Sequence, residues 1–162
     1  MVKAKEPGII HFENLDPGFC NEVASLPGGE NIRKCFACGT CSAGCPVTTI
    51  DEEYNPRKII RQILFGMREE VLKSPVIWFC MMCYRCYARC PQQVNFTDVM
   101  RAIRYLAIKN KAVPADILSN NDEIDRLSQL IRRDMVKHTI EGRKQVIKEI
   151  KSKIDNVMES NH

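Results

Sequence analysis

Eight of the nine cysteines in this 162-residue chain form two groups with identical internal spacing. The groups read CFACGTCSAGCP, with Cys35, Cys38, Cys41 and Cys45, and CMMCYRCYARCP, with Cys80, Cys83, Cys86 and Cys90. Both follow C-x2-C-x2-C-x3-C-P, and corresponding cysteines stand at one constant offset of 45 residues. This spacing is typical of thiolate ligands to tetranuclear iron–sulfur clusters. The sequence therefore predicts two [4Fe–4S] clusters.

The fourth cysteine of each group differs from the other three in what it is expected to bind. Three cysteines on one tight loop hold three irons of a cubane, whereas the fourth, next to a proline, ligates the other cluster. Cluster I is thus predicted to bind Cys35, Cys38, Cys41 and Cys90. Cluster II is predicted to bind Cys80, Cys83, Cys86 and Cys45. Such crossed ligation would couple cluster assembly to folding.

Other uses of cysteine fit this pattern less well. Structural zinc usually takes cysteines in pairs to build a tetrahedral site, and three cysteines at successive two-residue gaps suit it poorly. Cys20 stands alone, and we expect it to be a small buried thiol. The isolated His11, His138 and His162 are assigned to no metal.

The residues between the cysteines differ between the two loops. The first loop has small uncharged residues at the places where the second has two tyrosines and two arginines: Gly39, Thr40, Ser42 and Gly44 against Tyr84, Arg85, Tyr87 and Arg89. Cluster potentials follow charge, hydrogen bonds to sulfur and exposure. We expect the two clusters to have unequal reduction potentials. If Arg85 faces cluster II, it raises the potential of that cluster; alternatively, both arginines face solvent.

A helix is expected after each cysteine group. In the first, Asn55 is the predicted cap and Pro56 the first helical residue. Its apolar stripe comprises Ile59, Ile60, Ile63, Leu64 and Met67, ending near Gly66. In the second, Thr97 is the predicted cap, and the stripe comprises Val99, Met100, Ile103, Leu106 and Ala107. The chain should be mainly α, a ligand loop then a helix, twice over, with both stripes packing in a core.

Three segments are expected along the chain. Residues 1–31 should form an irregular arm with a short helix around residues 20–25. Residues 32–113 should form the two-cluster domain, and residues 114–162 a charged helical tail. Between residues 126 and 153 the tail has nine Lys or Arg and three Asp or Glu. It either docks on a partner or packs on its own domain.

Composition excludes several other functions. The net charge of +4 is too small to indicate nucleic-acid binding. The first residues lack the apolar region of a secretory signal. The longest uncharged apolar stretch, residues 74–84, is too short to cross a bilayer of about 30 Å, so no membrane span is expected. We expect a cytoplasmic protein, where thiols stay reduced and dense cysteines indicate metal binding.

Three stretches carry a resemblance to a known family: CFACGTCSAGCP, NPRKIIRQILFG and VIWFCMMCYRCYARCP. Over roughly residues 32–108, the chain resembles the C subunit of heterodisulfide reductase. The resemblance implies an α-helical ferredoxin fold around two [4Fe–4S] clusters in an anaerobic microbe. It also implies two partners, a flavin-containing A subunit that supplies electrons and a B subunit whose CCG motifs carry the disulfide-reducing site.

The chain itself has neither a CCG motif nor a flavin-type G-x-G-x-x-G. We therefore expect a non-catalytic electron-transfer subunit of an oxidoreductase complex, with no catalytic residue of its own. Two alternatives remain open. One is the iron–sulfur relay of a membrane-linked quinone or fumarate-type dehydrogenase, and the other is a free two-cluster ferredoxin, although such ferredoxins are usually shorter and acidic.

Overall fold

The computed structural model of the protein describes residues 12–159, with side chains up to residue 156. Its contacts divide the chain into two units, Met1–Ala115 and Asp116–His162. Between residues 12 and 159 every regular element is a helix, and no strand occurs there. The predicted mainly α fold is therefore confirmed.

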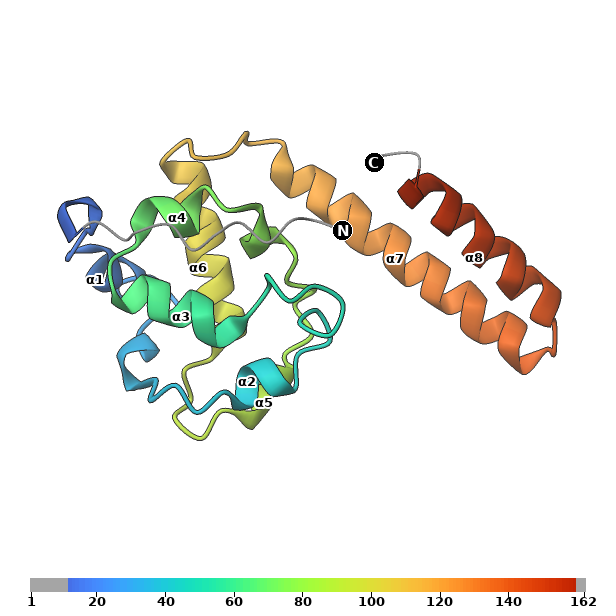
Figure 1. Ribbon diagram of the computed structural model, residues 1–162, viewed down its shortest axis with the longest axis horizontal. Helices are drawn as coiled ribbons and strands as arrows, with labels where there is room; N and C mark the ends of the chain where they lie inside the picture. Colours follow the sequence, from blue (N-terminus) through green and yellow to red (C-terminus); the bar gives the residue numbers. More distant parts are fainter. Residues whose placement is uncertain (1–11, 160–162) are drawn as a thin grey trace. The chain divides into compact units, whose positions relative to one another are not determined.

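The first unit contains six α-helices and three short 3-10 helices within its described part (Figure 1). In chain order they are η1 (Phe12–Asn14), α1 (Phe19–Ala24), η2 (Ile32–Lys34), α2 (Thr40–Ala43), α3 (Pro56–Leu64), α4 (Arg68–Leu72), η3 (Pro75–Trp78), α5 (Arg85–Arg89) and α6 (Phe96–Lys109). The internal repeat is visible in this order, because each group of cysteines contains a short helix and is followed by a longer one: α2 then α3, and α5 then α6.

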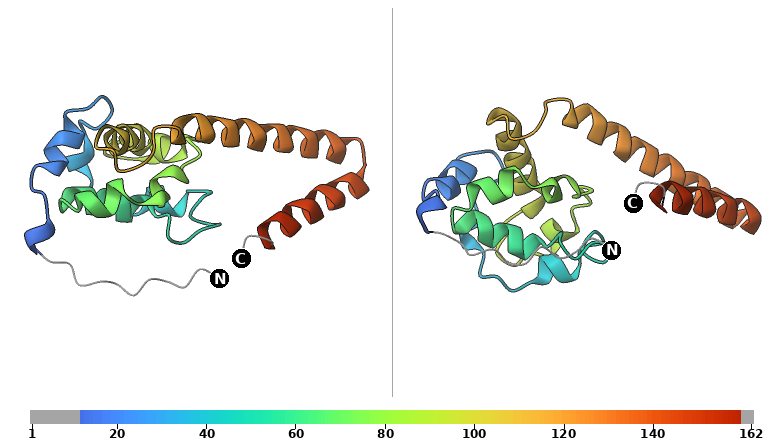
Figure 2. Two further views of the ribbon diagram at one scale, coloured as in Figure 1. Left: turned by 90° about the horizontal axis from the view of Figure 1, so that it is seen from above. Right: turned by 45° about the horizontal axis from the view of Figure 1, so that its top comes forward.

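The two longer helices of the repeat supply the core. On α3 three residues of the predicted stripe, Ile59, Ile60 and Ile63, are each at most 3% exposed, whereas Leu64 is only partly buried. On α6 the whole predicted stripe is buried: Val99, Met100, Ile103, Leu106 and Ala107. In the left view of Figure 2, α6 is seen nearly end-on while α3 lies across the page. The two helices therefore run in different directions, and α1 contacts both.

The start of α3 agrees with prediction, whereas its end and the start of α6 do not. The Asn55 side chain accepts a hydrogen bond from the amide of Lys58, and Pro56 is the first helical residue. Met67 lies beyond the end of α3 and precedes α4, a helix that the sequence did not predict. At α6 the cap is Asn95, in a left-handed conformation, so the prediction of Thr97 was wrong. Thr97 lies inside the first turn and is buried.

The described residues before position 32 contribute to this core. The short helix expected around residues 20–25 is α1, where Phe19 and Val23 are fully buried. Cys20 is 5% exposed, which confirms a buried thiol. The amide of Asp16 donates to the carbonyl of Gly66 at 2.8 Å, linking this segment to the α3–α4 turn. Residues 1–11 of the expected arm lie outside the described residues, and the predicted boundary at residue 31 stays a prediction.

The second unit is a helical hairpin of α7 (Ile117–Ile140) and α8 (Lys144–Glu159). Val146, Ile147 and Ile150, which recur at helical spacing in the sequence, lie on α8. Gly142 makes the turn with φ +71°, a conformation that suits glycine. None of the described α7 side chains is buried. Within residues 12–159, no helix is long and apolar enough to span a lipid bilayer.

Candidate iron–sulfur centres

The two cysteine loops lie next to each other because α2 packs against α5 (Figure 1). A close approach at Gly44 permits this contact. The Arg89 guanidinium lies where a side chain on Gly44 would be, so any larger residue there would displace it. The loops that lead into α2 and α5 carry the first two cysteines of each group, and the third, Cys41 or Cys86, lies within the short helix.

The backbones of the two loops repeat as well as their cysteines. Ala37 and Gly39 in the first loop, and Met82 and Tyr84 in the second, all have positive φ, between 48° and 83°. These pairs stand at the same offset as the cysteines. For a residue other than glycine this conformation costs about 1–3 kcal/mol and persists only where the surroundings enforce it. Both loops are thus bent in the same way around their cysteine side chains.

The cysteines line two separate cavities. The first is lined by Cys35, Cys38, Cys41, Cys86 and Cys90. The second is lined by Cys45, Cys80, Cys83 and Cys86. The fourth cysteine of each loop therefore lines the cavity of the other loop, while Cys86 borders both.

This donor set fits two tetranuclear clusters. Each cavity offers four sulfur ligands from the predicted set, and apolar side chains such as Ile60, Val94 and Phe96 line the first cavity beside them. Among the described residues, no three His, Cys, Asp or Glu side chains are grouped as a single metal ion would need. A cubane does not require such a group, since each thiolate binds a different iron. The crossed assignment agrees with these linings and stays a prediction.

The thiols differ in how readily they ionise. The pKa of the exposed Cys38 thiol is lowered, chiefly because Thr40 hydrogen-bonds to it. Burial raises the pKa of Cys41 and that of Cys86. Because the thiolate is the metal ligand, iron supplies the positive charge that the buried positions need to ionise.

Two buried hydroxyl groups at the second cavity were not expected from the sequence as functional groups. Tyr54 and Thr97 both line this cavity, and each is 1% exposed. Thr97 Oγ1 lies 3.3 Å from Cys86 Sγ, and Tyr54 lines the cavity together with Cys80. Burial, followed by the neighbouring Cys80, raises the pKa of Tyr54 far above its usual range, so the hydroxyl keeps its proton.

A buried arginine holds the beginning of the second loop. Arg104 of α6 is 6% exposed. Its Nε donates to the carbonyl of Ile77 at 2.9 Å, and Nη2 donates to the carbonyl of Cys80 at 2.8 Å. The guanidinium carbon also lies 5.1 Å from the centre of the Trp78 ring. Arg104 thereby fixes the backbone of a predicted cluster ligand.

Exposed arginines stand beside both cavities. Arg85 lines the second cavity, in agreement with a charge facing cluster II. Arg57, which lies on α3 and outside the first loop, lines the first cavity next to Gly39. The expectation that charge distinguishes the two loops considered only residues between the cysteines. It missed Arg57, which reaches the first loop only through folding.

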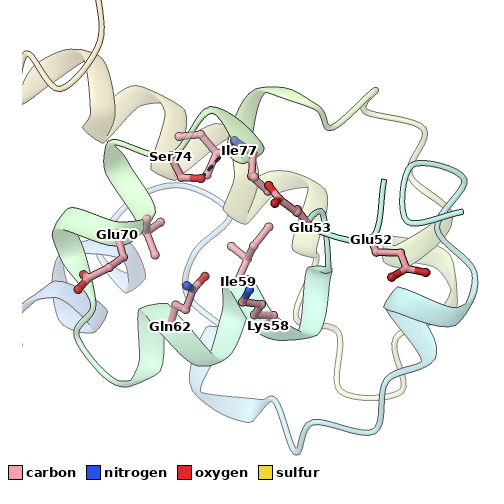
Figure 3. Close-up of a pocket in the computed structure, with 10 residues that line it drawn as sticks. Glu52, Glu53, Lys58, Ile59, Gln62, Glu70, Ser74 and Ile77 are labelled. Carbon is pink, nitrogen blue, oxygen red and sulfur yellow. Dashed lines mark hydrogen bonds between the residues drawn. The ribbon is translucent and has the colours of Figure 1, made fainter. Parts of the chain in front are cut away.

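A polar groove lies apart from the cysteines, along α3, α4 and η3 (Figure 3). Its volume is about 380 Å³, and its lining includes Glu52, Glu53 and Glu70 with the single cation Lys58. None of the cysteines lines it. In Figure 3, Glu70 and Glu52 lie toward opposite ends of the groove, so their carboxylates do not converge.

Comparison with known proteins gives the same class for this site. Residues 31–94 match the family described as 4Fe-4S dicluster domain. Together with the helical fold, this match defines a helical iron–sulfur protein with two [4Fe–4S] clusters.

The relatives identify the family more closely. The iron–sulfur C subunit of the CoB–CoM heterodisulfide reductase from Methanopyrus kandleri is 31% identical, over 93% of this chain and 88% of its own length. The C2 subunit of the H(2)/formate:CoB-CoM heterodisulfide,ferredoxin reductase from Methanococcus maripaludis is 40% identical, over 65% of this chain and 61% of its own. The chain belongs to the family of heterodisulfide reductase C subunits.

Other relatives are matched over a smaller part. The C subunit of the H(2):CoB-CoM heterodisulfide,ferredoxin reductase from Methanothermobacter thermautotrophicus is 36% identical, over 65% of this chain. The alignment spans 56% of that relative's length. Family membership supports electron transfer by iron–sulfur clusters within an oxidoreductase complex.

Proposed function

We propose that this chain passes electrons from a flavin-containing subunit to a disulfide-reducing subunit of a heterodisulfide reductase-like complex. The observation that carries the proposal is the pair of cysteine cavities, one beside the other, formed by the contact of α2 with α5. When bound, each cluster takes up and releases one electron without making or breaking bonds to a substrate. The residues of this chain bind the clusters and set their surroundings.

Apolar side chains at the cavities support contact with other subunits. Phe36, next to Cys35, is 60% exposed. Phe79 and Met81, on either side of Cys80, are 41% and 49% exposed. Aromatic and methionine side chains are enriched in protein interfaces, and here they border both predicted cluster sites. A partner that covers either loop would bury apolar surface and bring its own redox group close to a cluster.

The proposed role needs no catalytic residue in this chain. In the proposed complex, the disulfide would be reduced on the partner with CCG motifs, and electrons would enter from the flavin-containing partner. The titratable groups of both cavities are cysteines with Tyr54, Arg57 and Arg85, and in this proposal each binds a cluster or surrounds it.

Reconstitution tests this function. The anaerobically purified chain, loaded with iron and sulfide and reduced chemically, should reduce no disulfide alone. It should support disulfide reduction when a CCG-type partner is added, and a flavin-containing partner should replace the chemical reductant.

Cys20→Ala is the matched control, since Cys20 lies in the core outside both cavities, and it should relay electrons normally. Disulfide turnover by the chain alone, at the rate of the complex, would contradict the proposal. The proposal would also be contradicted if the chain purified together with a membrane quinone enzyme, or without any partner.

A further inference from the structure

The surroundings of the second cavity differ from those of the first in their buried hydrogen-bond donors. Tyr54 precedes α3 and Thr97 lies in the first turn of α6, so different halves of the repeat bring the two hydroxyls to one cavity. Thr97 Oγ1 is 3.3 Å from Cys86 Sγ, and Tyr54 lines the same cavity as Cys80, where burial and then the Cys80 side chain raise the pKa of the Tyr54 hydroxyl. Two of the thiols of the second loop therefore share their cavity with a buried hydroxyl.

The direction of these hydrogen bonds follows from the chemistry of the ligand. A cysteine that binds iron is a thiolate and has no hydrogen to donate. In a hydrogen bond between Thr97 and Cys86, or between Tyr54 and Cys80, the hydroxyl must therefore be the donor. One-electron reduction adds negative charge, part of which falls on the sulfurs, so a donor to sulfur stabilises the reduced form more than the oxidised form.

The first cavity has a weaker version of this arrangement. Thr40 Oγ1 lies 3.3 Å from Cys38 Sγ, but both residues are exposed. Ser42, next to Cys41, gives its hydroxyl hydrogen to Asn55 Oδ1 at 2.7 Å, and the amide of Val94 lies 3.4 Å from Cys90 Sγ. Water can replace an exposed hydroxyl at little cost, whereas a donor in a buried, low-dielectric site has no such substitute.

We propose that Tyr54 and Thr97 raise the reduction potential of the cluster at the second loop above that of the cluster at the first. An electron held by the protein then rests at the second loop. This inference deepens the proposed relay function. It rests on that proposal in one respect, the presence of two clusters. It does not depend on where Cys45 and Cys90 bind, because both hydroxyls lie beside cysteines of the second loop itself.

Neighbouring contacts hold the two hydroxyls in place. The carbonyl of Tyr54 accepts a hydrogen bond from Thr48 Oγ1 at 2.8 Å. The Cys80 backbone, opposite Tyr54, is fixed by Arg104. Thr97 belongs to a helix whose apolar face lies in the core. The donors are therefore positioned by the fold before a cluster is reduced.

Near-isosteric variants test the inference. Tyr54→Phe and Thr97→Val each remove a hydroxyl and leave the shape almost unchanged. In redox titrations of the cluster-loaded chain, followed by electron paramagnetic resonance, both should shift the second-loop cluster to lower potential. The double variant should lower the second-loop potential further. Thr97→Ser, which keeps a hydroxyl, should have the potential of the unaltered protein. Thr40→Val, the exposed counterpart, should shift the first-loop cluster less. Unchanged second-loop potentials, or equal shifts of both clusters, would overturn the inference.

Deuterium exchange provides a second measurement, which starts from the unaltered protein. After exchange into D2O, pulsed resonance should detect deuterons coupled to the reduced second-loop cluster, and the coupling should weaken in Tyr54→Phe or Thr97→Val. Absence of such deuterons overturns the inference. Potentials and couplings are measured on the isolated chain, whereas failure of the relay is seen only in disulfide reduction with partners. The two failures are therefore distinguishable.

Discussion

Arg57 and Arg85 come from different parts of the chain and line different cysteine cavities. A nearby cation favours the reduced form of a cluster, and the charge of arginine cannot titrate away. A unit charge at about 4 Å contributes about 1 kcal/mol in water and about 4 kcal/mol at an effective dielectric of about 20. Since about 1.4 kcal/mol corresponds to about 59 mV, exposed arginines should contribute on the order of tens of millivolts.

Replacing each arginine by glutamine should therefore act on one cluster only. Arg85→Gln should lower the potential of the second-loop cluster, and Arg57→Gln that of the first-loop cluster. A redox titration of both variants checks this, with each serving as the control for the other. If Arg85→Gln leaves the second-loop potential unchanged, its side chain faces solvent when the cluster is bound.

Residue spacing predicted the two clusters but did not indicate which other residues surround them. Cysteine loops are local, so the spacing of eight cysteines suffices to indicate two clusters. Arg57, Tyr54 and Thr97 reach the cavities only because α3 and α6 pack as they do. No local pattern marks such residues, and Thr97 resembled a helix cap because threonine is common at that position.

At the level of elements, α6 connects the core to the second cysteine loop. Arg104 reaches from this helix to the carbonyls of Ile77 and Cys80. An unpaired buried carbonyl costs about 1–3 kcal/mol, and a shorter neutral side chain would leave one or both unpaired.

Arg104→Gln should therefore lower the free energy of unfolding of the cluster-loaded chain by about 1–3 kcal/mol or more. Anaerobic denaturant titration measures this, and loss of iron from the second loop should accompany it. Arg101→Gln, on the same helix with a side chain 60% exposed, should change stability little. Equal losses in the two variants would show that the Arg104 hydrogen bonds do not hold the loop.

Helix prediction succeeded where apolar periodicity was strong. The stripe of α6 is buried as expected, and so are Ile59, Ile60 and Ile63 of α3. The charged run after Gly66 instead forms α4, because Val71 and Leu72 have room in the core. The glycines and prolines before residue 32 suggested an irregular arm with one short helix, and Phe19 and Val23 anchor that helix, α1, in the core. A few apolar residues decided these segments, and their burial depends on tertiary contacts that sequence periodicity does not report.

At the scale of the whole molecule, the chain consists of a cluster-bearing unit and a helical hairpin. The hairpin carries exposed apolar side chains on α7, including Ile124, Leu127 and Ile131. The change in composition after Pro114 predicted a separate helical segment, but composition alone does not identify what covers these side chains.

The two halves of the first unit are expected to depend on each other through Cys45 and Cys90. Each lies at the end of one loop and lines the cavity of the other. If the ligation is crossed, neither loop can complete its cluster alone, so cluster assembly and folding are coupled. This is the central structural claim about the site.

Four alanine variants test it directly. Cys38→Ala and Cys83→Ala damage the first-loop and second-loop clusters respectively and provide reference spectra in the reduced state. The electron paramagnetic resonance spectrum of Cys45→Ala should then match that of Cys83→Ala, and that of Cys90→Ala should match Cys38→Ala. The opposite pairing, Cys45→Ala with Cys38→Ala and Cys90→Ala with Cys83→Ala, would contradict crossed ligation.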